Sequence, residues 1–219
     1  MIFGKIEYLN LLPFHLFMKR YSRSSQFYMS FRYKEGVPAK INADYLAKRV
    51  DAAFISSIKA QKESYVDLGI IAKREVLSVL LLPSEQDVED RESASSNILA
   101  KVLGLHGEVL IGDKALRHYL AGDDNAIDLA KAWYDEYNLP FVFALLCYHR
   151  YNREVKKVAL RFKNSPVKIP QYMLLRASKR THVAPHAIKH YLSFISYELD
   201  YKAKKSLKKF WRLSKTHQG

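Results

Sequence analysis

Apolar and polar positions in the first 80 residues switch between the spacing typical of strands and the spacing typical of helices. Residues 2–9, 26–33 and 51–56 fit strands, and residues 13–21 and 41–49 carry apolar side chains at helical spacing. Strands that alternate with helices are typical of an α/β protein with a mainly parallel sheet. We therefore expect the chain to begin with such a unit.

A second α/β unit follows a change in composition. Residues 75–84 read as an apolar strand, and the polar stretch EQDVEDRE, residues 85–92, comes directly after it. The elements predicted beyond this link are a helix over 93–104, which hydroxyls can cap and Gly104 can end, a strand over 108–113, and helices over 114–120 and 126–137.

The last third of the chain begins with an apolar strand over 139–150 and then reads as helical, including residues 184–199 and 201–215. Two lobes joined by two crossing strands would produce this order of elements. We expect lobe I to contain residues 1–76 and 147–219, and lobe II residues 77–146. In such proteins a ligand lies in the cleft where strand ends and helix starts converge.

Charge is the unusual bulk property of this 219-residue chain, whose 48% hydrophobic content is ample for a packed core. The 36 basic and 22 acidic residues give a net charge of +14, which favours anionic partners. Most cations are dispersed between apolar positions without a recognisable nucleic-acid motif, so we expect no nucleic-acid partner. Residues 201–215 concentrate seven cations, which we interpret as the solvated face of a docked helix, with surface RNA or membrane attachment as the alternative.

Several classes of protein are disfavoured by what the sequence lacks. No run approaches the roughly 20 apolar residues of a membrane-spanning helix, and signal-peptide features are missing, so we expect a cytoplasmic protein without membrane insertion. Cys147 is the only cysteine, and its apolar surroundings predict a buried thiol. Zinc spacing, a phosphate loop and a dinucleotide fingerprint are absent, and the eight histidines are scattered outside any nucleophile motif. We expect neither a metal nor a cofactor.

Uncharged polar and acidic side chains recur where predicted strands end and helices begin. Hydroxyls and free backbone amides at a helix start can bind an anion without a cation. Each residue alone is explained by capping or exposure, but together they outline a polar cleft suited to a small carboxylate. The set comprises Asn10, Ser56, Ser57, Ser95, Ser96 and Asp113, together with Ser78 in the predicted crossing strand.

Six segments of the chain occur in a distinctive order and spacing. They are IEYLNLLPF, GVPAKINADYLAKRVDAAFISS, SVLLLPS, ESASSNILAKVL, VLIGDKAL and DLAKAWYDEYNLPFVFA. Taken together they resemble one family, the chorismate dehydratases of the futalosine route to menaquinone, and the similarity covers nearly the whole chain. The resemblance implies a periplasmic-binding-protein type II fold used as an enzyme. It also implies conversion of chorismate to 3-[(1-carboxyvinyl)oxy]benzoate and water without a cofactor.

The resemblance also gives the polar residues provisional roles. We expect Asn10 to orient the substrate and to hydrogen-bond where charge develops, and Ser56, Ser57, Ser78, Ser95 and Ser96 to hold its carboxylates. Asp113 would bind a hydroxyl or only cap its helix. The matched motifs contain no obvious His or Lys base, so the hypothesis is that the enolpyruvyl carboxylate of the substrate takes the proton.

Two other functions remain open at this point. A cytoplasmic binding or sensor protein of the same fold could hold a small carboxylate without turning it over. Asn10 followed by Pro13 favours the enzyme, because a binding protein would more typically hold a dianion with Arg. A basic nucleic-acid-associated protein is motivated only by the net charge.

Overall fold

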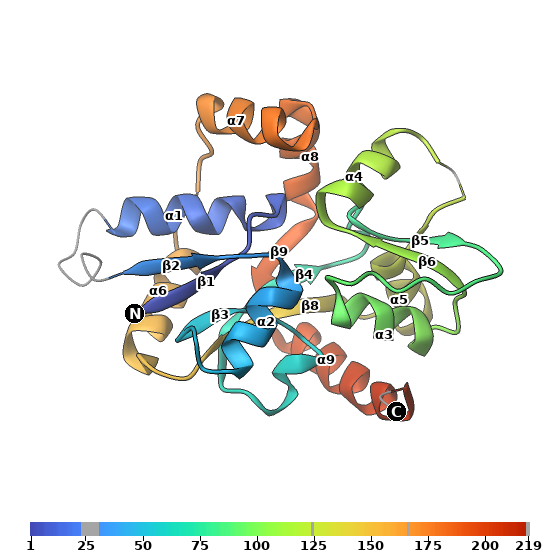
Figure 1. Cartoon of the computed structure of the whole chain (residues 1–219), viewed down its shortest axis with the longest axis horizontal. Coiled ribbons are helices and arrows are strands. Elements are labelled where there is room, and N and C mark those ends of the chain that lie inside the picture. Colours follow the sequence, from blue (N-terminus) through green and yellow to red (C-terminus); the bar gives the residue numbers. More distant parts are fainter. Residues whose placement is uncertain (23–30, 124, 166, 218–219) are drawn as a thin grey trace.

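The computed structural model describes residues 1–22, 31–123, 125–165 and 167–217, in which two sheets form the centres of two lobes (Figure 1). In sheet order, the larger sheet contains β2 (Arg32–Glu35), β1 (Ile2–Lys5), β3 (Ala52–Ser56), β8 (Phe141–Tyr148), β4 (Tyr65–Ala72) and β9 (Ile195–Glu198). The smaller sheet contains β6 (Gly107–Ile111), β5 (Val79–Pro83) and β7 (Ile127–Asp128). The predicted α/β class is thus confirmed.

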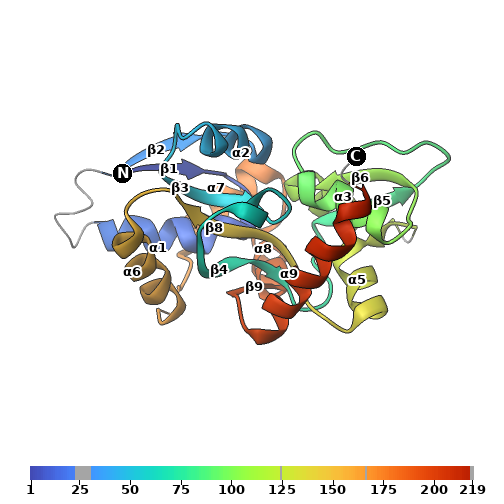
Figure 2. The same cartoon turned by 90° about the horizontal axis from the view of Figure 1, so that it is seen from below.

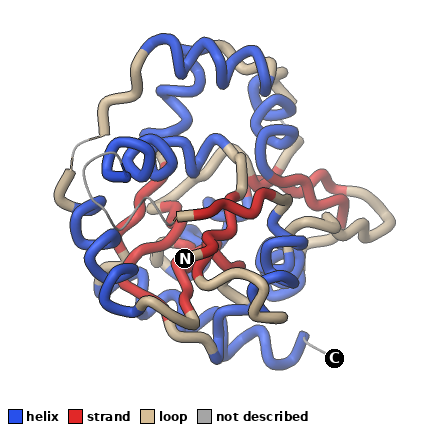
Figure 3. Tube along the Cα trace, turned by 60° about the vertical axis from the view of Figure 1, so that its left-hand side comes forward, coloured by secondary structure: helices blue, strands red, loops and turns tan. Residues whose placement is uncertain are grey.

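Helices pack around these strands (Figure 3). The α-helices are α1 (Leu12–Ser22), α2 (Pro38–Leu46), α3 (Ala94–Val102), α4 (Gly112–Leu120), α5 (Leu129–Tyr137), α6 (Asn152–Lys163), α7 (Gln171–Thr181), α8 (Pro185–Ser193) and α9 (Tyr201–Leu213). Short 3₁₀ helices are η1 (Leu9–Leu11), η3 (Lys59–Lys62) and η4 (Ser214–His217). None of the described helices is long and apolar enough to cross a membrane.

The prediction of a mainly parallel sheet was wrong. β1 is parallel to β2 and β3, but β8 is antiparallel to β3 and β4, and β4 is antiparallel to β9. The smaller sheet is antiparallel. Two consecutive strands are parallel only if a crossover returns the chain to the end of the sheet at which the first strand began. Here β8 instead enters the larger sheet from the smaller lobe, which reverses its direction.

One helix prediction was wrong because distant strand pairing overrides the local pattern. The helix predicted over 184–199 ends at Ser193, and Ile195–Glu198 forms β9 against β4. Within β9, Ile195 and Tyr197 alternate as strand residues do. β4 itself was not predicted. The first strand ends at Lys5 rather than at residue 9, and residues 26–30 of the strand predicted over 26–33 lie outside the described residues.

The chain crosses between the sheets at residues 73–78 and 138–140. The carboxylate of Asp128 fixes the first crossing, because its Oδ2 accepts hydrogen bonds from the backbone N–H groups of Val76 at 2.8 Å and Leu77 at 2.7 Å. Its Oδ1 accepts from Ala130 and Lys131 at 2.9 and 3.0 Å and so caps α5. One side chain therefore holds the crossing segment to the start of a smaller-lobe helix.

The basic C-terminal helix α9 docks on both lobes, as Figure 2 shows from below. Trp133 of α5 donates its Nε1–H to Ser206 Oγ at 2.9 Å, and Trp211 donates to the Ser57 carbonyl at 2.8 Å. Leu207 and Phe210 are buried, which confirms the docked helix predicted from the sequence. The predicted burial of Cys147 is also confirmed, and burial raises the pKa of its thiol.

Candidate functional site

A narrow cavity of about 80 Å³ lies between the larger and smaller sheets. Its apolar wall comes from strands of both sheets and includes Phe54, Ile70, Val79, Ile111 and Phe143. Its polar wall consists of Tyr8, Asn10, Ser56, Ser78, Glu92, Ser93 and Ser96. The cavity therefore offers an apolar slot for a ring and oxygen-bearing groups around it.

Helix N-termini supply positive potential to this cavity. Pro38 is the first residue of α2, Ser93 is the N-cap of α3 and Gly112 is the first residue of α4, and all three line the cavity. The unpaired N–H groups at a helix start carry a partial positive charge and favour anions. No Lys, Arg or His side chain is among the described residues that line it. Carboxylates bound here would be held by helix starts and hydroxyls.

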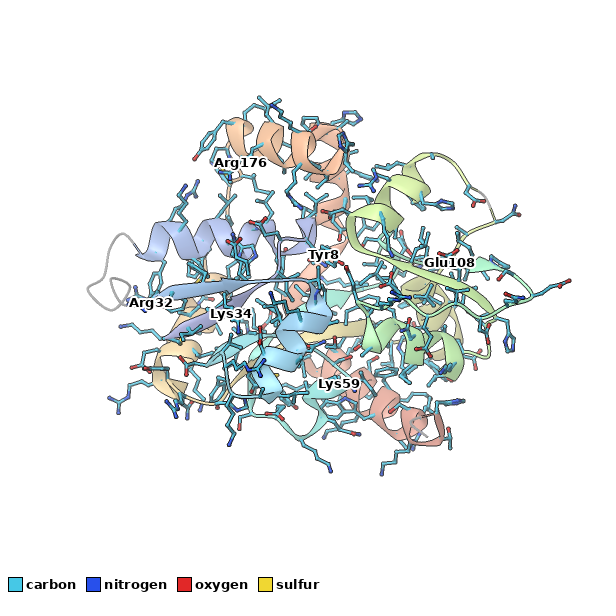
Figure 4. All side chains as sticks on the ribbon, in the orientation of Figure 1. Tyr8, Arg32, Lys34, Lys59, Glu108 and Arg176 are labelled. Atoms are coloured by element: carbon cyan, nitrogen blue, oxygen red, sulfur yellow. The ribbon has the colours of Figure 1, made fainter. Side chains whose placement is uncertain are left out.

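Tyr8 and Glu92 connect the two lobes across the cavity. The Tyr8 hydroxyl donates a hydrogen bond to the Glu92 carboxylate, and Figure 4 labels Tyr8 at the junction of the lobes. Burial raises the pKa of Tyr8, so its proton stays on the hydroxyl. Ligand cavities usually enclose roughly 300–1,000 Å³. The space between the lobes is smaller than this, and the Tyr8–Glu92 hydrogen bond lies beside it.

Gly112 allows the Tyr8 ring to lie against the start of α4. Its φ is +68°, a left-handed conformation that favours glycine, and a Cβ there would lie 2.8 Å from the Tyr8 ring. A side chain at this position would strain the backbone and displace the ring. The glycine therefore sets the distance between Tyr8 and the smaller lobe.

Asn10 lines the cavity from the 3₁₀ helix η1, five residues beyond Lys5, the last residue of β1. Its carbonyl accepts a hydrogen bond from the Tyr197 hydroxyl at 2.6 Å, which fixes the backbone of the turn. The turn thus holds Asn10 at the cavity wall.

Three of the predicted serines line the cavity with Asn10. Ser56 Oγ accepts a hydrogen bond from Asn42 Nδ2 at 2.7 Å, Ser78 Oγ lies 2.9 Å from the Tyr191 hydroxyl, and Ser96 Oγ accepts from Ser93 Oγ at 2.6 Å. Each hydroxyl is therefore oriented by a neighbour before any ligand binds.

Ser57, Ser95 and Asp113 lie outside the residues that line the cavity. Ser57 Oγ and Ser95 Oγ are 3.1 Å apart and buried, and Ser95 Oγ also accepts from the Ile58 N–H at 3.2 Å. The pair joins the end of β3 to α3. Asp113 accepts from the Leu9 N–H at 3.2 Å and pairs with Arg180 at 3.1 Å. Burial raises the pKa of Asp113, against the opposing effects of the Leu9 hydrogen bond and Arg180.

Tyr8, Glu92, Ser93 and Gly112 belong to the cavity but were not selected from the sequence. A glycine at the end of a predicted strand, just before a predicted helix, was the available signal for Gly112. Glu92 had no such signal, because it ends a polar link that reads as solvated. Within the described residues, no group of three or more His, Cys, Asp or Glu side chains could hold a metal ion.

Solved structures with the same arrangement identify the class of protein first. A protein of Archaeoglobus fulgidus superposes with a TM-score of 0.69 at 12% identity, covering 99% of this chain and 97% of its own. A Candida albicans protein described as having the generic periplasmic binding protein fold gives 0.58 at 11% identity, with 100% and 91% covered. The chain therefore has a periplasmic-binding-protein-like fold, as the resemblance implied.

Sequence comparison then identifies the family. A family model described as menaquinone biosynthesis matches residues 1–107 and 94–216. A chorismate dehydratase of Campylobacter jejuni is 40% identical over 98% of this chain and 98% of its own length. One from Thermus thermophilus is 27% identical over 95% of this chain and 93% of its own. The chain belongs to the chorismate dehydratase family, and the predicted membership of this enzyme family is confirmed.

Proposed function

We propose that this protein dehydrates chorismate to 3-[(1-carboxyvinyl)oxy]benzoate in the futalosine route to menaquinone, in the cytoplasm. The observation that carries the proposal is 40% identity to a chorismate dehydratase along essentially the full length of both chains. The cavity supports it, because an apolar slot bordered by hydroxyls and helix starts suits a ring with two carboxylates. No cofactor is part of the proposal.

The reaction is an elimination driven by aromaticity. A base removes the proton on C3 of the cyclohexadiene ring, and the electrons of the C3–H bond form the C3=C4 double bond. The C4–O bond breaks, and the departing hydroxide takes a proton to become water. The protein contributes position and electrostatic stabilisation, which can lower such a barrier by several kcal/mol.

Asn10 is the proposed catalytic residue. Its amide would hydrogen-bond to the substrate where charge develops, from a turn whose carbonyl Tyr197 already holds. Ser56, Ser78 and Ser96 are proposed to hold the carboxylates together with the starts of α3 and α4. Ser57, Ser95 and Asp113 were predicted to touch the substrate, and their hydrogen bonds suit positioning of these elements instead.

The base is proposed to be the enolpyruvyl carboxylate of the substrate itself. Glu92 is the competing base, because it is the carboxylate among the described residues that line the cavity. Its hydrogen bond from Tyr8 occupies one of its oxygens. Chorismate esterified at the enolpyruvyl carboxylate should not react with the wild type, whereas the Glu92→Gln variant should still convert chorismate. If the wild type converts the ester and the Glu92→Gln variant converts neither compound, Glu92 is the base.

The role of Asn10 is tested by Asn10→Ala with Asn164→Ala as the matched control, because Asn164 is exposed at the end of α6. Asn10→Ala should fold and show chorismate dehydration reduced by at least tenfold, and Asn164→Ala should match the wild type. Near-normal turnover in Asn10→Ala would remove Asn10 from the mechanism. Binding of chorismate without turnover by the wild type would instead indicate a binding or sensor protein.

A further inference from the structure

A second, larger cavity lies beside the first, on the far side of Tyr8. It encloses about 350 Å³ between α1, α7 and the strands β1 and β2, and Tyr8 lines both cavities. Its volume falls within the roughly 300–1,000 Å³ of typical small-molecule sites. Figure 4 labels Arg176 on α7, opposite α1, and Tyr8 at the lobe junction. The proposed dehydration does not involve this second cavity.

The second cavity carries positive charge at its rim. Its described lining includes four cations, Lys5, Lys19, Arg176 and Arg180, against one carboxylate, Glu7. Lys5 is neutralised by Glu7 and Glu35, each at 2.7 Å, and Arg180 by Asp113 at 3.1 Å. Arg176 forms no hydrogen bond or ion pair with any described residue. An anion entering this cavity would therefore find an uncompensated guanidinium, which binds carboxylates with two parallel hydrogen bonds.

Arg176 and Arg180 are four residues apart on α7 and so lie on the same face of the helix. An anion held by Arg176 would also approach Arg180. Because Arg180 already has Asp113 as a partner, Arg176 would contribute most of the binding free energy.

The remainder of the lining is apolar and aromatic. Leu12 and Leu16 of α1 face Met173 and Ala177 of α7, with Tyr33 of β2 completing the wall. His15 adds no charge at neutral pH, because burial lowers its pKa to about 4. A cavity that binds only an inorganic anion would not need these apolar and aromatic walls. Apolar walls beneath an arginine match a flat ring that carries a carboxylate.

We propose that the second cavity binds a small aromatic or alicyclic monocarboxylate, with its ring among the apolar side chains of α1 and α7 and its carboxylate on Arg176. This site is separate from the cavity that contains Asn10. The inference stands on the geometry of the second cavity and does not depend on chorismate being the substrate.

The probe for this site is 4-bromobenzoate, titrated calorimetrically into the full-length protein. Its affinity should fall at least tenfold in Arg176→Gln and stay unchanged in Arg153→Gln, the matched control on the exposed surface of α6. Both arginines are exposed, and urea unfolding will verify that both variants fold. Equal affinity of the wild type and Arg176→Gln would overturn the proposal.

Crystals grown with the same probe locate it by the anomalous scattering of bromine. A bromine position between α1 and α7 would support the site. Bromine found only in the cavity that contains Asn10, or only at scattered surface positions, would overturn the proposal. Inorganic phosphate serves as the second ligand. If phosphate binds in a way that requires Arg176 but 4-bromobenzoate does not bind, the proposed ligand class is refuted.

Discussion

His15 should make the stability of this protein depend on pH in mildly acidic solution. Its Nε2 lies 2.8 Å from the Ile6 carbonyl, to which the neutral ring donates, and its Nδ1 is buried without a hydrogen-bond partner among the described residues. Burial lowers the pKa of His15 from 6.5 to about 4, against the Ile6 hydrogen bond. Nearby Lys5 also lowers this pKa, and Glu7 and Glu35 oppose it.

The size of the effect follows from linkage. Because the pKa of His15 is lower in the folded state, the unfolded chain takes up the proton first as the pH falls. The stabilisation by the neutral ring is complete above pH 6.5 and is lost as the pH falls through about 4. Each pH unit within that window corresponds to about 1.4 kcal/mol, so the loss between pH 7 and pH 5 is about 2 kcal/mol.

Urea unfolding at pH 7 and pH 5 measures this loss. The wild type should lose about 2 kcal/mol more than His15→Gln, which keeps a donor for the Ile6 carbonyl but does not titrate. His186→Gln replaces an exposed histidine of α8 and should keep the wild-type pH dependence. If His15→Gln and the wild type lose the same free energy between the two pH values, the buried neutral state assigned to His15 is wrong.

Three further substitutions test how the lobes are held together. Gly112→Ala should lower the thermal unfolding temperature more than Gly104→Ala. Both glycines have positive φ, but only a Cβ at position 112 would contact the Tyr8 ring. Equal decreases in the unfolding temperature would contradict that contact. Asp128→Ala should lower the free energy of unfolding, measured in urea, by about 3 kcal/mol, because it removes the acceptor of four backbone N–H groups. A decrease of less than about 1 kcal/mol would contradict the role of Asp128 at the crossing. Ser206→Ala should cost about 1–3 kcal/mol in the same assay by leaving the Trp133 N–H unpaired, and an unchanged value would show that this bond adds nothing.

Elements with local signals could be predicted from the sequence. Ser93 caps α3 by accepting from the Ser96 N–H at 3.2 Å, and Gly104 follows that helix with a φ of +64°, as the pattern indicated. β4 and β9 could not be recognised in the same way. Their stability comes from pairing with segments that are distant in the sequence, β4 with β8 and β9, and no local period encodes that pairing.

The candidate site shows the same division between local and distant information. Ser56 ends β3 and lines the cavity, whereas the next residue, Ser57, does not line it and instead contacts Ser95. The N-cap Ser93 and Ser96 of α3 both line the cavity, and Ser95 contacts Ser57 instead. Residue type alone could not separate these serines. The Tyr8–Glu92 contact joins residues 84 positions apart and needed the folded lobes to become visible.

The measurement that tests the account most directly is incubation of the purified wild-type protein with chorismate alone, followed by chromatography and mass spectrometry. Chorismate should disappear as 3-[(1-carboxyvinyl)oxy]benzoate appears in equal amount, without an added cofactor. Asn10→Ala should slow this conversion at least tenfold. Chorismate that stays unconverted in the presence of the folded wild-type protein would contradict the proposed function.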